Sequence, residues 1–256
     1  MGDPTSRQSI VALDKVSFEY VSGPGWARVR TPVLHEFSLD IAAGEMVGLV
    51  GESGSGKTTI GRLCLGLIRP TSGQVLFGGR PMPRRHQPGS LAVVLQHPQW
   101  SLNPRASVGK SVAEPLVLAG VDRARRQSRV AEILQQVGLN ESFASRYPGQ
   151  LSGGQRQRVS IARALVTEPR FILFDEAVSA LDVSIQSQIL NLIKALQAEH
   201  NFGAIFISHD LAATRYVAQR ILVMRNGSIE HEGDADSFYR PSENAYTRRL
   251  QLASDL

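Results

Sequence analysis

A glycine-rich loop that joins an apolar run to a helix-like segment constrains this chain more than any other feature. The apolar run covers residues 46–50, and the loop consists of Gly51, Glu52, Ser53, Gly54, Ser55, Gly56, Lys57 and Thr58. A run that short and that apolar is typical of a buried parallel strand. The glycines let backbone N–H groups turn inward around an anion, and the helix that begins here adds its positive end. The loop is therefore predicted to bind phosphate groups, with Lys57 reaching the outer phosphates and the Thr58 hydroxyl binding Mg²⁺.

A second apolar run, residues 171–174, ends in two carboxylates, Asp175 and Glu176. At the carboxyl end of a strand beside the phosphate-binding loop, Asp175 can hold Mg²⁺. Glu176 is then placed to orient or deprotonate an attacking water molecule. A strand that merely ends in solvated acids is the alternative, but the loop in the same chain favours the chemical role.

Length and composition limit the classes of protein to which the chain can belong. Its 256 residues suit one large domain, or one domain with a substantial insertion. The single cysteine, Cys64, excludes internal disulfides and metal clusters held by cysteines. No run of about 18 apolar residues exists, and residues 1–9 lack the apolar core of a secretory signal, so we expect a cytoplasmic protein. The net charge of +5 comes without a long basic block, so a nucleic-acid partner is not expected.

The spacing of apolar residues predicts an α/β fold that a helical segment interrupts. Strands are expected at residues 10–20, 33–41, 46–50, 74–77, 91–96, 171–174 and 204–208. Helices are expected at residues 57–67, 184–199, 210–218 and 244–252. Glycine and proline predict a loop at residues 22–32 and a turn at residues 70–73.

Two further patterns complete the predicted organisation. From about residue 98 to residue 166 strand signals vanish and helical periodicity dominates, which indicates a helical insertion within the α/β domain. Asn226 and Gly227 lie between two short runs, 220–224 and 228–232, and this pattern predicts a β-hairpin. We therefore expect a single domain over residues 1–256, which closes with a hairpin and a helix at about 220–252.

A second glycine-rich segment opens a predicted helix at residues 155–165, and it consists of Leu151, Ser152, Gly153, Gly154 and Gln155. Such a helix start is a second candidate phosphate site, although Ser-Gly-Gly is also an ordinary way to begin a helix. Leu-Ser-Gly-Gly-Gln resembles the signature motif of ATP-binding cassette (ABC) ATPases. The resemblance implies a P-loop NTPase of ABC type, with a RecA-like α/β core, an N-terminal antiparallel β-subdomain and a helical insertion subdomain.

The resemblance also implies the ligands and the way in which they are bound. In that family the signature of one subunit covers the γ-phosphate bound by the P-loop of another, so two domains sandwich two ATP molecules head to tail. The implied cofactors are ATP and Mg²⁺, and the implied activity is ATP hydrolysis. Besides the loop of residues 51–58, Thr59 and the signature residues Ser152, Gly153, Gly154 and Gln155 are then expected to contact ATP.

Four more residues stand where the family has functional ones. Gln96 resembles the Q-loop glutamine, which senses Mg²⁺ and the attacking water and links to the membrane subunits. Asp182 resembles the D-loop aspartate at the dimer interface, although it also suits a helix cap. His209 resembles the switch histidine that contacts the γ-phosphate. Tyr20 resembles the aromatic residue that stacks on adenine, although an aromatic on an early strand also suits a core.

Finer features resemble one branch of the family, the importer subunits for dipeptides, oligopeptides and nickel. They lie at residues 96–105, 179–192 and 245–248. Ala177 departs from the proline of most peptide-importer subunits and matches nickel-type subunits, while Asn244 and Ala245 replace a His-Pro pair. These points favour the shorter of two ATPases in an importer of nickel, metal chelates or peptides.

The implied partners are a second ABC ATPase, identical or not, two transmembrane permease subunits and an extracytoplasmic substrate-binding protein. The implied location is peripheral, on the cytoplasmic face of the inner membrane. ATPases of exporters or peptide-resistance systems remain open as alternatives. A soluble ABC ATPase acting on DNA would carry a long coiled-coil insertion or a cysteine-rich zinc module, and an ABC translation factor would usually carry two cassettes.

Overall fold

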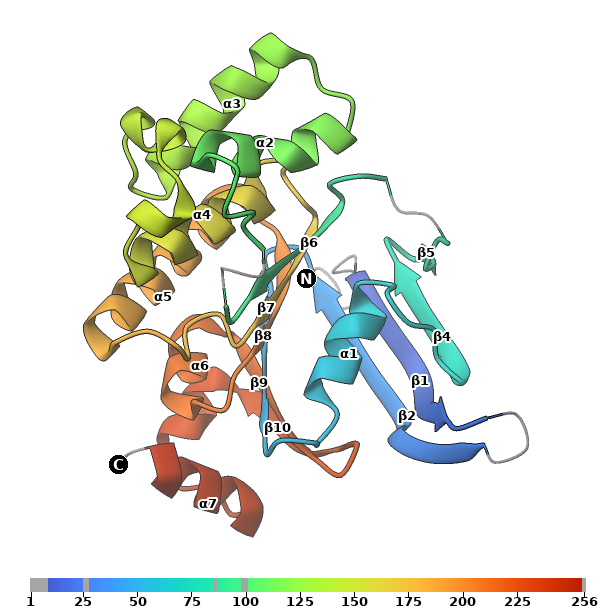
Figure 1. The fold of residues 1–256 in the computed structure, drawn as a ribbon. Coiled ribbons are helices and arrows are strands. Elements are labelled where there is room, and N and C mark those ends of the chain that lie inside the picture. Colours follow the sequence, from blue (N-terminus) through green and yellow to red (C-terminus); the bar gives the residue numbers. More distant parts are fainter. Residues whose placement is uncertain (1–8, 25–27, 85–86, 98–100, 255–256) are drawn as a thin grey trace, which may run out of the picture. The chain divides into compact units, whose positions relative to one another are not determined.

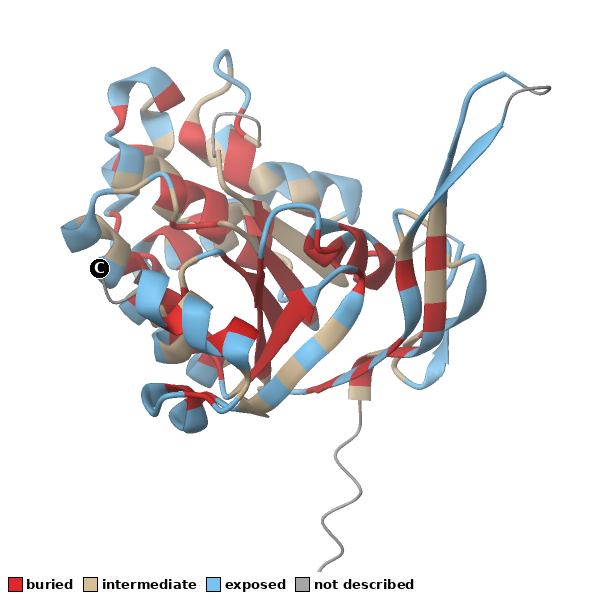
Figure 2. Cartoon of the chain, turned by 90° about the horizontal axis from the view of Figure 1, so that it is seen from below, coloured by how far each residue is buried: buried red, intermediate tan, exposed pale blue. Residues whose placement is uncertain are grey.

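The computed structural model describes residues 9–24, 28–84, 87–97 and 101–254. The chain divides into two compact units, Met1–Arg84 with Gly203–Leu256 as the first and Arg85–Phe202 as the second. Residues 25–27 of the predicted loop and residues 98–100 of the segment 96–105 lie outside the described residues. Residues 46–51, 171–174 and 203–207, which lie in strands, are buried, while other strands and the helices include half-buried and exposed residues (Figure 2).

The first unit contains the expected antiparallel sheet near the N-terminus (Figure 1). Its strand order is β2-β1-β4-β5, with bounds Ser9–Ser22 for β1, Val29–Ala42 for β2, Ser72–Phe77 for β4 and Arg80–Pro81 for β5. The loop predicted for residues 22–32 is therefore wrong at its end, because Val29 already pairs with Ser22 across the hairpin. The turn predicted at residues 70–73 is shorter than expected, because β4 already begins at Ser72. A Cβ on Gly73 would lie 2.2 Å from the carbonyl oxygen of Lys15, so the close approach of β1 and β4 requires glycine there.

Four more strands of the first unit are hydrogen-bonded in the order β10-β9-β3-β8. Their bounds are Met46–Gly51 for β3, Gly203–Ile207 for β8, Arg220–Arg225 for β9 and Ser228–Asp234 for β10. Strand β3 is parallel to both β8 and β9, and all residues of β3 and β8 are buried, as the unbroken apolar runs predict. Strands β9 and β10 form the predicted hairpin around Asn226 and Gly227, both with positive φ.

The helices of the first unit are α1 at Lys57–Cys64, α6 at Leu211–Val217, α7 at Ala245–Ser254 and a short 3-10 turn at Ala235–Tyr239. Helix α1 is shorter than the predicted 57–67. Gly66 takes a left-handed φ of 64°, and the N–H groups of Gly66 and Leu67 donate to the carbonyls of Leu63 and Arg62. These two bonds form a Schellman motif, which ends the helix at Cys64.

The second unit combines two parallel strands with four α-helices and two 3-10 turns among its described residues. The strands are β6 at Leu91–Leu95 and β7 at Phe171–Asp175. The helices are α2 at Val108–Leu118, α3 at Arg123–Gln136, α4 at Gly153–Leu165 and α5 at Val183–His200, with 3-10 turns at Glu141–Ser145 and Pro148–Gln150. Described residues 101–166 contain no strand, in line with the expected helical character. The assignment of residues 98–166 as an insertion in one domain stays a prediction.

The apolar residues whose spacing predicted helix α5 lie on one side of it. Ile189, Ile193 and Leu196 are buried, and Ile185 and Leu192 are half-buried on the same side. Within the part of the chain that the structure describes, no helix has both the length and the apolar character needed to cross a bilayer.

Candidate functional site

The glycine-rich loop connects β3 to α1 in the first unit, as predicted. Gly51, Gly54 and Gly56 have φ values of 148°, 83° and 106°, which side-chain-bearing residues rarely adopt. A Cβ on Gly51 would lie 2.2 Å from the carbonyl oxygen of Met224 in β9, so the close approach of the two strands also requires glycine there. Among the described residues, nothing would lie within 4 Å of a Cβ on Gly54, so the loop is open there. The loop therefore has the backbone shape of an anion cradle.

The side chain of Lys57 folds back over the start of this loop. It is only 7% exposed, and its Nζ donates to the carbonyl oxygens of Gly51 at 2.6 Å and Glu52 at 2.8 Å. The hydroxyl of Ser55 lies 3.4 Å from the same nitrogen. The neighbouring Thr58 is exposed, so its hydroxyl is accessible to a ligand at the loop. The ammonium is thus held in place by the carbonyl oxygens of the loop itself.

His209 leaves the same edge of the sheet as the loop. Leu49 of β3 pairs with Ile207 of β8 in a parallel ladder, and the N–H of Ser208 donates to the carbonyl of Leu49. His209 follows directly and is exposed, and Asp210 then caps α6 by accepting a hydrogen bond from the N–H of Ala213 at 3.0 Å. The carboxyl ends of neighbouring parallel strands meet at one edge, so the phosphate loop and His209 share that edge.

Tyr20 reaches the helix that follows the loop. Its hydroxyl lies 3.4 Å from the hydroxyl of Thr59, and Arg62 donates to it at 3.2 Å. The ring packs edge-on against Phe18 and remains 39% exposed. Tyr20 is therefore not a core residue, which was the alternative, and an exposed ring beside α1 is available for stacking.

In the second unit, Gln96, Asp175 and Glu176 lie at the carboxyl edge of a parallel strand pair. Leu95 of β6 is paired with Asp175 of β7, so Gln96 and Glu176 are the next residues on the two strands. Glu176 has a φ of 51°, a left-handed conformation that strains a residue with a side chain by about 1–3 kcal/mol. Its carbonyl accepts hydrogen bonds from the N–H and hydroxyl of Ser179, at 3.2 and 3.0 Å.

The signature segment begins α4 with a capping box. The hydroxyl of Ser152 accepts from the N–H of Gln155 at 3.3 Å, and the side chain of Gln155 accepts from the N–H of Ser152 at 3.0 Å. The glycines between them pack on the start of α5. A Cβ on Gly154 would lie 2.6 Å from Cγ2 of Ile185. The signature glycine is therefore required for a close contact within the second unit.

Asp182 occupies the N-cap position of α5, which was the alternative to a D-loop role. Its side chain makes no capping hydrogen bond within the described part of the chain. Leu181, the residue before it, lies 3.7 Å from the Cβ position of Gly153. The predicted D-loop and signature segments are thus neighbours in the second unit.

The structure places the predicted residues in two sets, one in each unit. The first unit holds residues 51–59, Tyr20 and His209. The second holds Gln96, Asp175 and Glu176 at one strand edge, and Asp182 at the start of α5 next to Leu181, which lies beside Gly153 of the signature residues 152–155. Sequence reasoning missed Tyr246 as a contact of the phosphate loop: its hydroxyl accepts a hydrogen bond from the N–H of Glu52 at 3.2 Å. The residues are 194 positions apart, so no local pattern could have indicated the contact.

Cys64 and Asp122 lie outside these sets and have shifted pKa values. Burial raises the pKa of the Cys64 thiol in α1 well above its usual range, so this cysteine remains a neutral, packed side chain. A hydrogen bond from the N–H of Arg125 lowers the pKa of Asp122, which caps α3. Neither group takes part in the candidate site.

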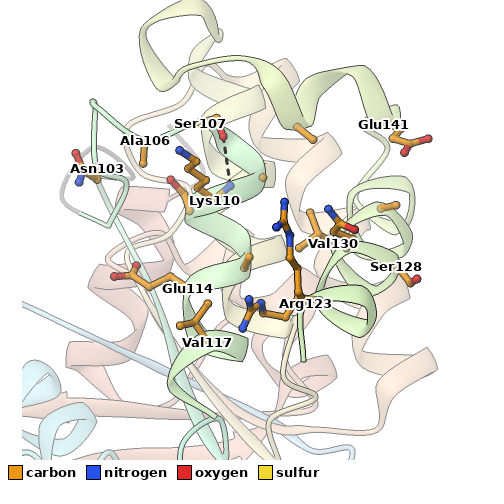
Figure 3. A pocket seen from close by; sticks show the side chains of 17 residues that line it. Asn103, Ala106, Ser107, Lys110, Glu114, Val117, Arg123, Ser128, Val130 and Glu141 are labelled. Atoms are coloured by element: carbon orange, nitrogen blue, oxygen red, sulfur yellow. Dashed lines mark hydrogen bonds between the residues drawn. The ribbon is translucent and has the colours of Figure 1, made fainter. Parts of the chain in front are cut away.

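A separate cavity of about 1150 Å³ lies in the second unit, beside α2 and α3 (Figure 3). Its lining includes apolar side chains such as Val117 and Val130 and charged ones such as Lys110, Glu114 and Arg123. None of the predicted ATP-contacting residues lines it. It is thus distinct from the candidate catalytic residues.

Comparisons with known proteins identify the family of the chain. The family model described as ABC transporter matches residues 34–179. A protein of Brucella abortus (strain 2308) named as a peptide import ATP-binding protein is 43% identical over 254 residues, which covers 95% of this chain and 76% of the relative. A protein of Brucella ovis with the same kind of name is 45% identical over 228 residues, which covers 86% of this chain and 72% of the relative.

Two solved structures are similar over most of the chain. The ATP-binding cassette MJ0796, solved as a dimer bound to ADP and Pi, has a TM-score of 0.74 and 31% identity, and covers 88% of this chain and 98% of its own. The cbiO1 protein of Clostridium perfringens, part of the ABC transporter complex cbiONQ, has a TM-score of 0.81 and 25% identity, and covers 97% of this chain and 100% of its own. The chain therefore belongs to the ABC transporter family, as an ATP-binding and ATP-hydrolysing subunit with the α/β fold of ABC cassettes.

Proposed function

We propose that this chain powers an ABC importer of dipeptides or oligopeptides. The observation that carries the proposal is the 43% identity over 95% of the chain to a protein named for peptide import. Nickel and metal chelates, the other substrates that the sequence resemblance implied, have no counterpart in the names of the reported relatives. Peptides are therefore the substrate class to test first.

The phosphates of ATP are proposed to bind to the backbone N–H groups of residues 51–58 and to Lys57. The open space beside Gly54 fits this role, because a phosphate needs room that side chains would fill. Thr58, Gln96 and Asp175 are proposed to hold Mg²⁺, which favours oxygen ligands and needs few protein ligands when phosphates supply the rest. In the described residues no group of three or more His, Cys, Asp or Glu side chains could hold a metal by itself, in keeping with an ion that arrives with the nucleotide.

Glu176 is proposed as the residue that orients or deprotonates the attacking water, with Gln96 and His209 as positioning groups. The left-handed backbone of Glu176 supports this role, because Ser179 fixes its carbonyl and so fixes the direction of the residue. When bound, Mg²⁺ neutralises charge on the phosphates of ATP. The carboxylate of Glu176 would orient the attacking water molecule or accept its proton.

The signature residues 152–155 and Asp182 are proposed to complete the ATP site of a second cassette. The start of α4 supports this, because the capping box occupies the N–H groups of Ser152 and Gln155 but not those of the two glycines between them. The similar MJ0796 cassette was solved as a dimer bound to ADP and Pi. Two cassettes, identical or not, would then close over two ATP molecules.

The proposed membrane partners are two permease subunits, which would place this chain on the cytoplasmic face of the inner membrane. An extracytoplasmic binding protein would deliver the peptide. The cavity beside α2 and α3 suits a short cytoplasmic helix of the permease, because both apolar and charged side chains line it (Figure 3). Val117 lines the cavity and Leu118 does not, although both are exposed apolar residues of α2. Val117→Arg should prevent copurification of the permease, and Leu118→Arg should not.

The catalytic assignment is tested by Glu176→Gln in the assembled transporter. We expect this variant to keep ATP binding and to lose most ATP hydrolysis. Glu168→Gln is a matched control, because Glu168 is an exposed glutamate with a similar φ of 53° in the same unit. Near-normal hydrolysis by Glu176→Gln would refute the assignment.

The phosphate loop is tested by Lys57→Ala, with Lys194→Ala on the exposed side of α5 as its control. Calorimetry should show weaker ATP binding for the first variant only.

The substrate class is tested in proteoliposomes, where ATP hydrolysis should be stimulated by a binding protein loaded with a dipeptide or oligopeptide. Stimulation by a nickel-loaded binding protein and by no peptide would contradict the proposal.

A further inference from the structure

Tyr246 links the C-terminal helix to the phosphate loop. It is the second residue of α7 and is only 3% exposed, so the whole side chain lies inside the first unit. Its hydroxyl oxygen accepts a hydrogen bond from the backbone N–H of Glu52, the second residue of the loop, at 3.2 Å. The contact is therefore made to the main chain of the loop and does not depend on the side chain of Glu52.

The peptide group that Tyr246 binds also holds Lys57. The N–H of Glu52 and the carbonyl of Gly51 belong to one planar peptide group, and that carbonyl accepts a hydrogen bond from Nζ of Lys57 at 2.6 Å. The next carbonyl, that of Glu52, accepts from the same nitrogen at 2.8 Å. The hydroxyl of Tyr246 thus fixes a peptide group that directly contacts the ammonium group of Lys57.

The ring of Tyr246 is held by its surroundings, so its hydroxyl has a defined position. It belongs to a buried cluster with Val50, the residue before the loop begins, and with Leu211, the first residue of α6. The guanidinium carbon of Arg225 lies 5.0 Å from the ring centroid. The side chain of Asn244 accepts from the N–H of Tyr246 at 3.0 Å and so fixes the start of α7.

We infer that Tyr246 is a positioning residue for ATP binding, because its hydroxyl presets the Gly51–Glu52 peptide group and, through the carbonyl of Gly51, Lys57. The ring alone would fill the core equally well without the hydroxyl, so a packing role leaves the hydrogen bond unexplained. Leu211 lies two residues after His209, so the same ring also supports the segment that carries the switch histidine. The inference rests on the proposed role of the phosphate loop.

Tyr246→Phe in the full chain removes the hydroxyl and keeps the ring. We expect the Kd for Mg-ATP to rise about three- to tenfold, the effect of losing one hydrogen bond to a part-buried donor. Tyr239→Phe is the control, because Tyr239 is 61% exposed and should leave the Kd unchanged. In the assembled transporter, KM for ATP should rise while kcat changes less than about twofold, since the hydroxyl acts on binding. A Kd within about twofold of the unchanged chain would overturn the inference.

A second measurement keeps the inference testable if Tyr246→Phe folds poorly. Amide hydrogen exchange in the unchanged chain should be slower at Glu52 than at Ser53, because only the Glu52 N–H is bonded to the buried tyrosine. Equal exchange at the two residues would overturn the inference. Lys57→Ala, measured in the same binding assay, separates the two ideas: weak binding by Lys57→Ala with normal binding by Tyr246→Phe refutes the tyrosine role alone. Normal binding by both variants refutes the loop assignment as well.

Discussion

The two signature glycines offer a sharp test, because the structure assigns opposite outcomes to the same substitution at adjacent positions. Gly153 and Gly154 are the first two residues of α4. A Cβ on Gly153 would lie 3.7 Å from Cδ2 of Leu181, an ordinary van der Waals distance. A Cβ on Gly154 would lie 2.6 Å from Cγ2 of Ile185, which is closer than real carbon atoms approach.

The expected magnitudes follow from these distances. Alanine is favoured over glycine within a helix by up to about 1 kcal/mol, so Gly153→Ala should leave the free energy of unfolding unchanged or slightly raised. Gly154→Ala gains the same helix preference but forces Ile185 to move, and overpacking typically costs about 1–3 kcal/mol. Ile185 is half-buried and its Cγ2 is attached directly to Cβ, so rotation of a flexible end cannot relieve the contact. The two variants should differ by about 2 kcal/mol.

Thermal unfolding without nucleotide measures the difference directly. About 2 kcal/mol corresponds to a gap of about 4–8 °C in Tm for a chain of this size, with Gly154→Ala the lower. Ile185→Ala introduced into Gly154→Ala should close most of this gap, because it removes the clashing methyl group. Equal Tm values for the two single variants would show that the start of α4 does not pack on α5 as the structure describes.

Three further predictions concern residues outside the signature. Gly51→Ala should abolish ATP binding and lower Tm, because the new methyl group would lie 2.2 Å from the carbonyl oxygen of Met224, and calorimetry and thermal unfolding check this. Cys64 should resist alkylation in the folded chain at neutral pH and react fully in denaturant, because burial raises its pKa, and mass spectrometry counts the modified thiols. Asp122 has a lowered pKa, so its stabilisation of α3 is present above the ordinary aspartate pKa of about 3.9 and is lost as the pH falls through the lower folded value. The Tm difference between the unchanged chain and Asp122→Asn should therefore change only in that acidic range.

The elements that surround the motifs were predictable because their signals are local. Strands β3, β7 and β8 are unbroken apolar runs, and each is followed at once by the polar residues that the chemistry needs. Neighbouring parallel strands end at the same edge of a sheet. Because His209 follows the apolar run of β8 and the phosphate loop follows the apolar run of β3, both are expected at that edge. The same reasoning places Glu176 beside Gln96.

The features that sequence reasoning missed depend on backbone geometry or on distant contacts. Helix α1 ends at Cys64 because Gly66 takes a left-handed conformation, and the glycine itself was the overlooked signal. The left-handed φ of Glu176 has no signature in residue type, since such conformations favour glycine and asparagine. The hydrogen bond between Tyr246 and Glu52 depends on how α7 packs, which the spacing of apolar residues along one helix does not determine.

The two signature glycines also allow the stability of α4 and its proposed role in ATP hydrolysis to be tested separately. The capping box engages Ser152 and Gln155 with each other, so the groups that remain to meet a phosphate are the backbone N–H groups of Gly153 and Gly154 at a helix N-terminus. A methyl group on the exposed Gly153 would stand beside those donors without disturbing the fold. Gly153→Ala should therefore keep its Tm and still lose ATP hydrolysis in the assembled transporter. Full hydrolysis by this stable variant would mean that the start of α4 does not approach a phosphate closely, and the proposed role of the signature would fail while the packing argument stood.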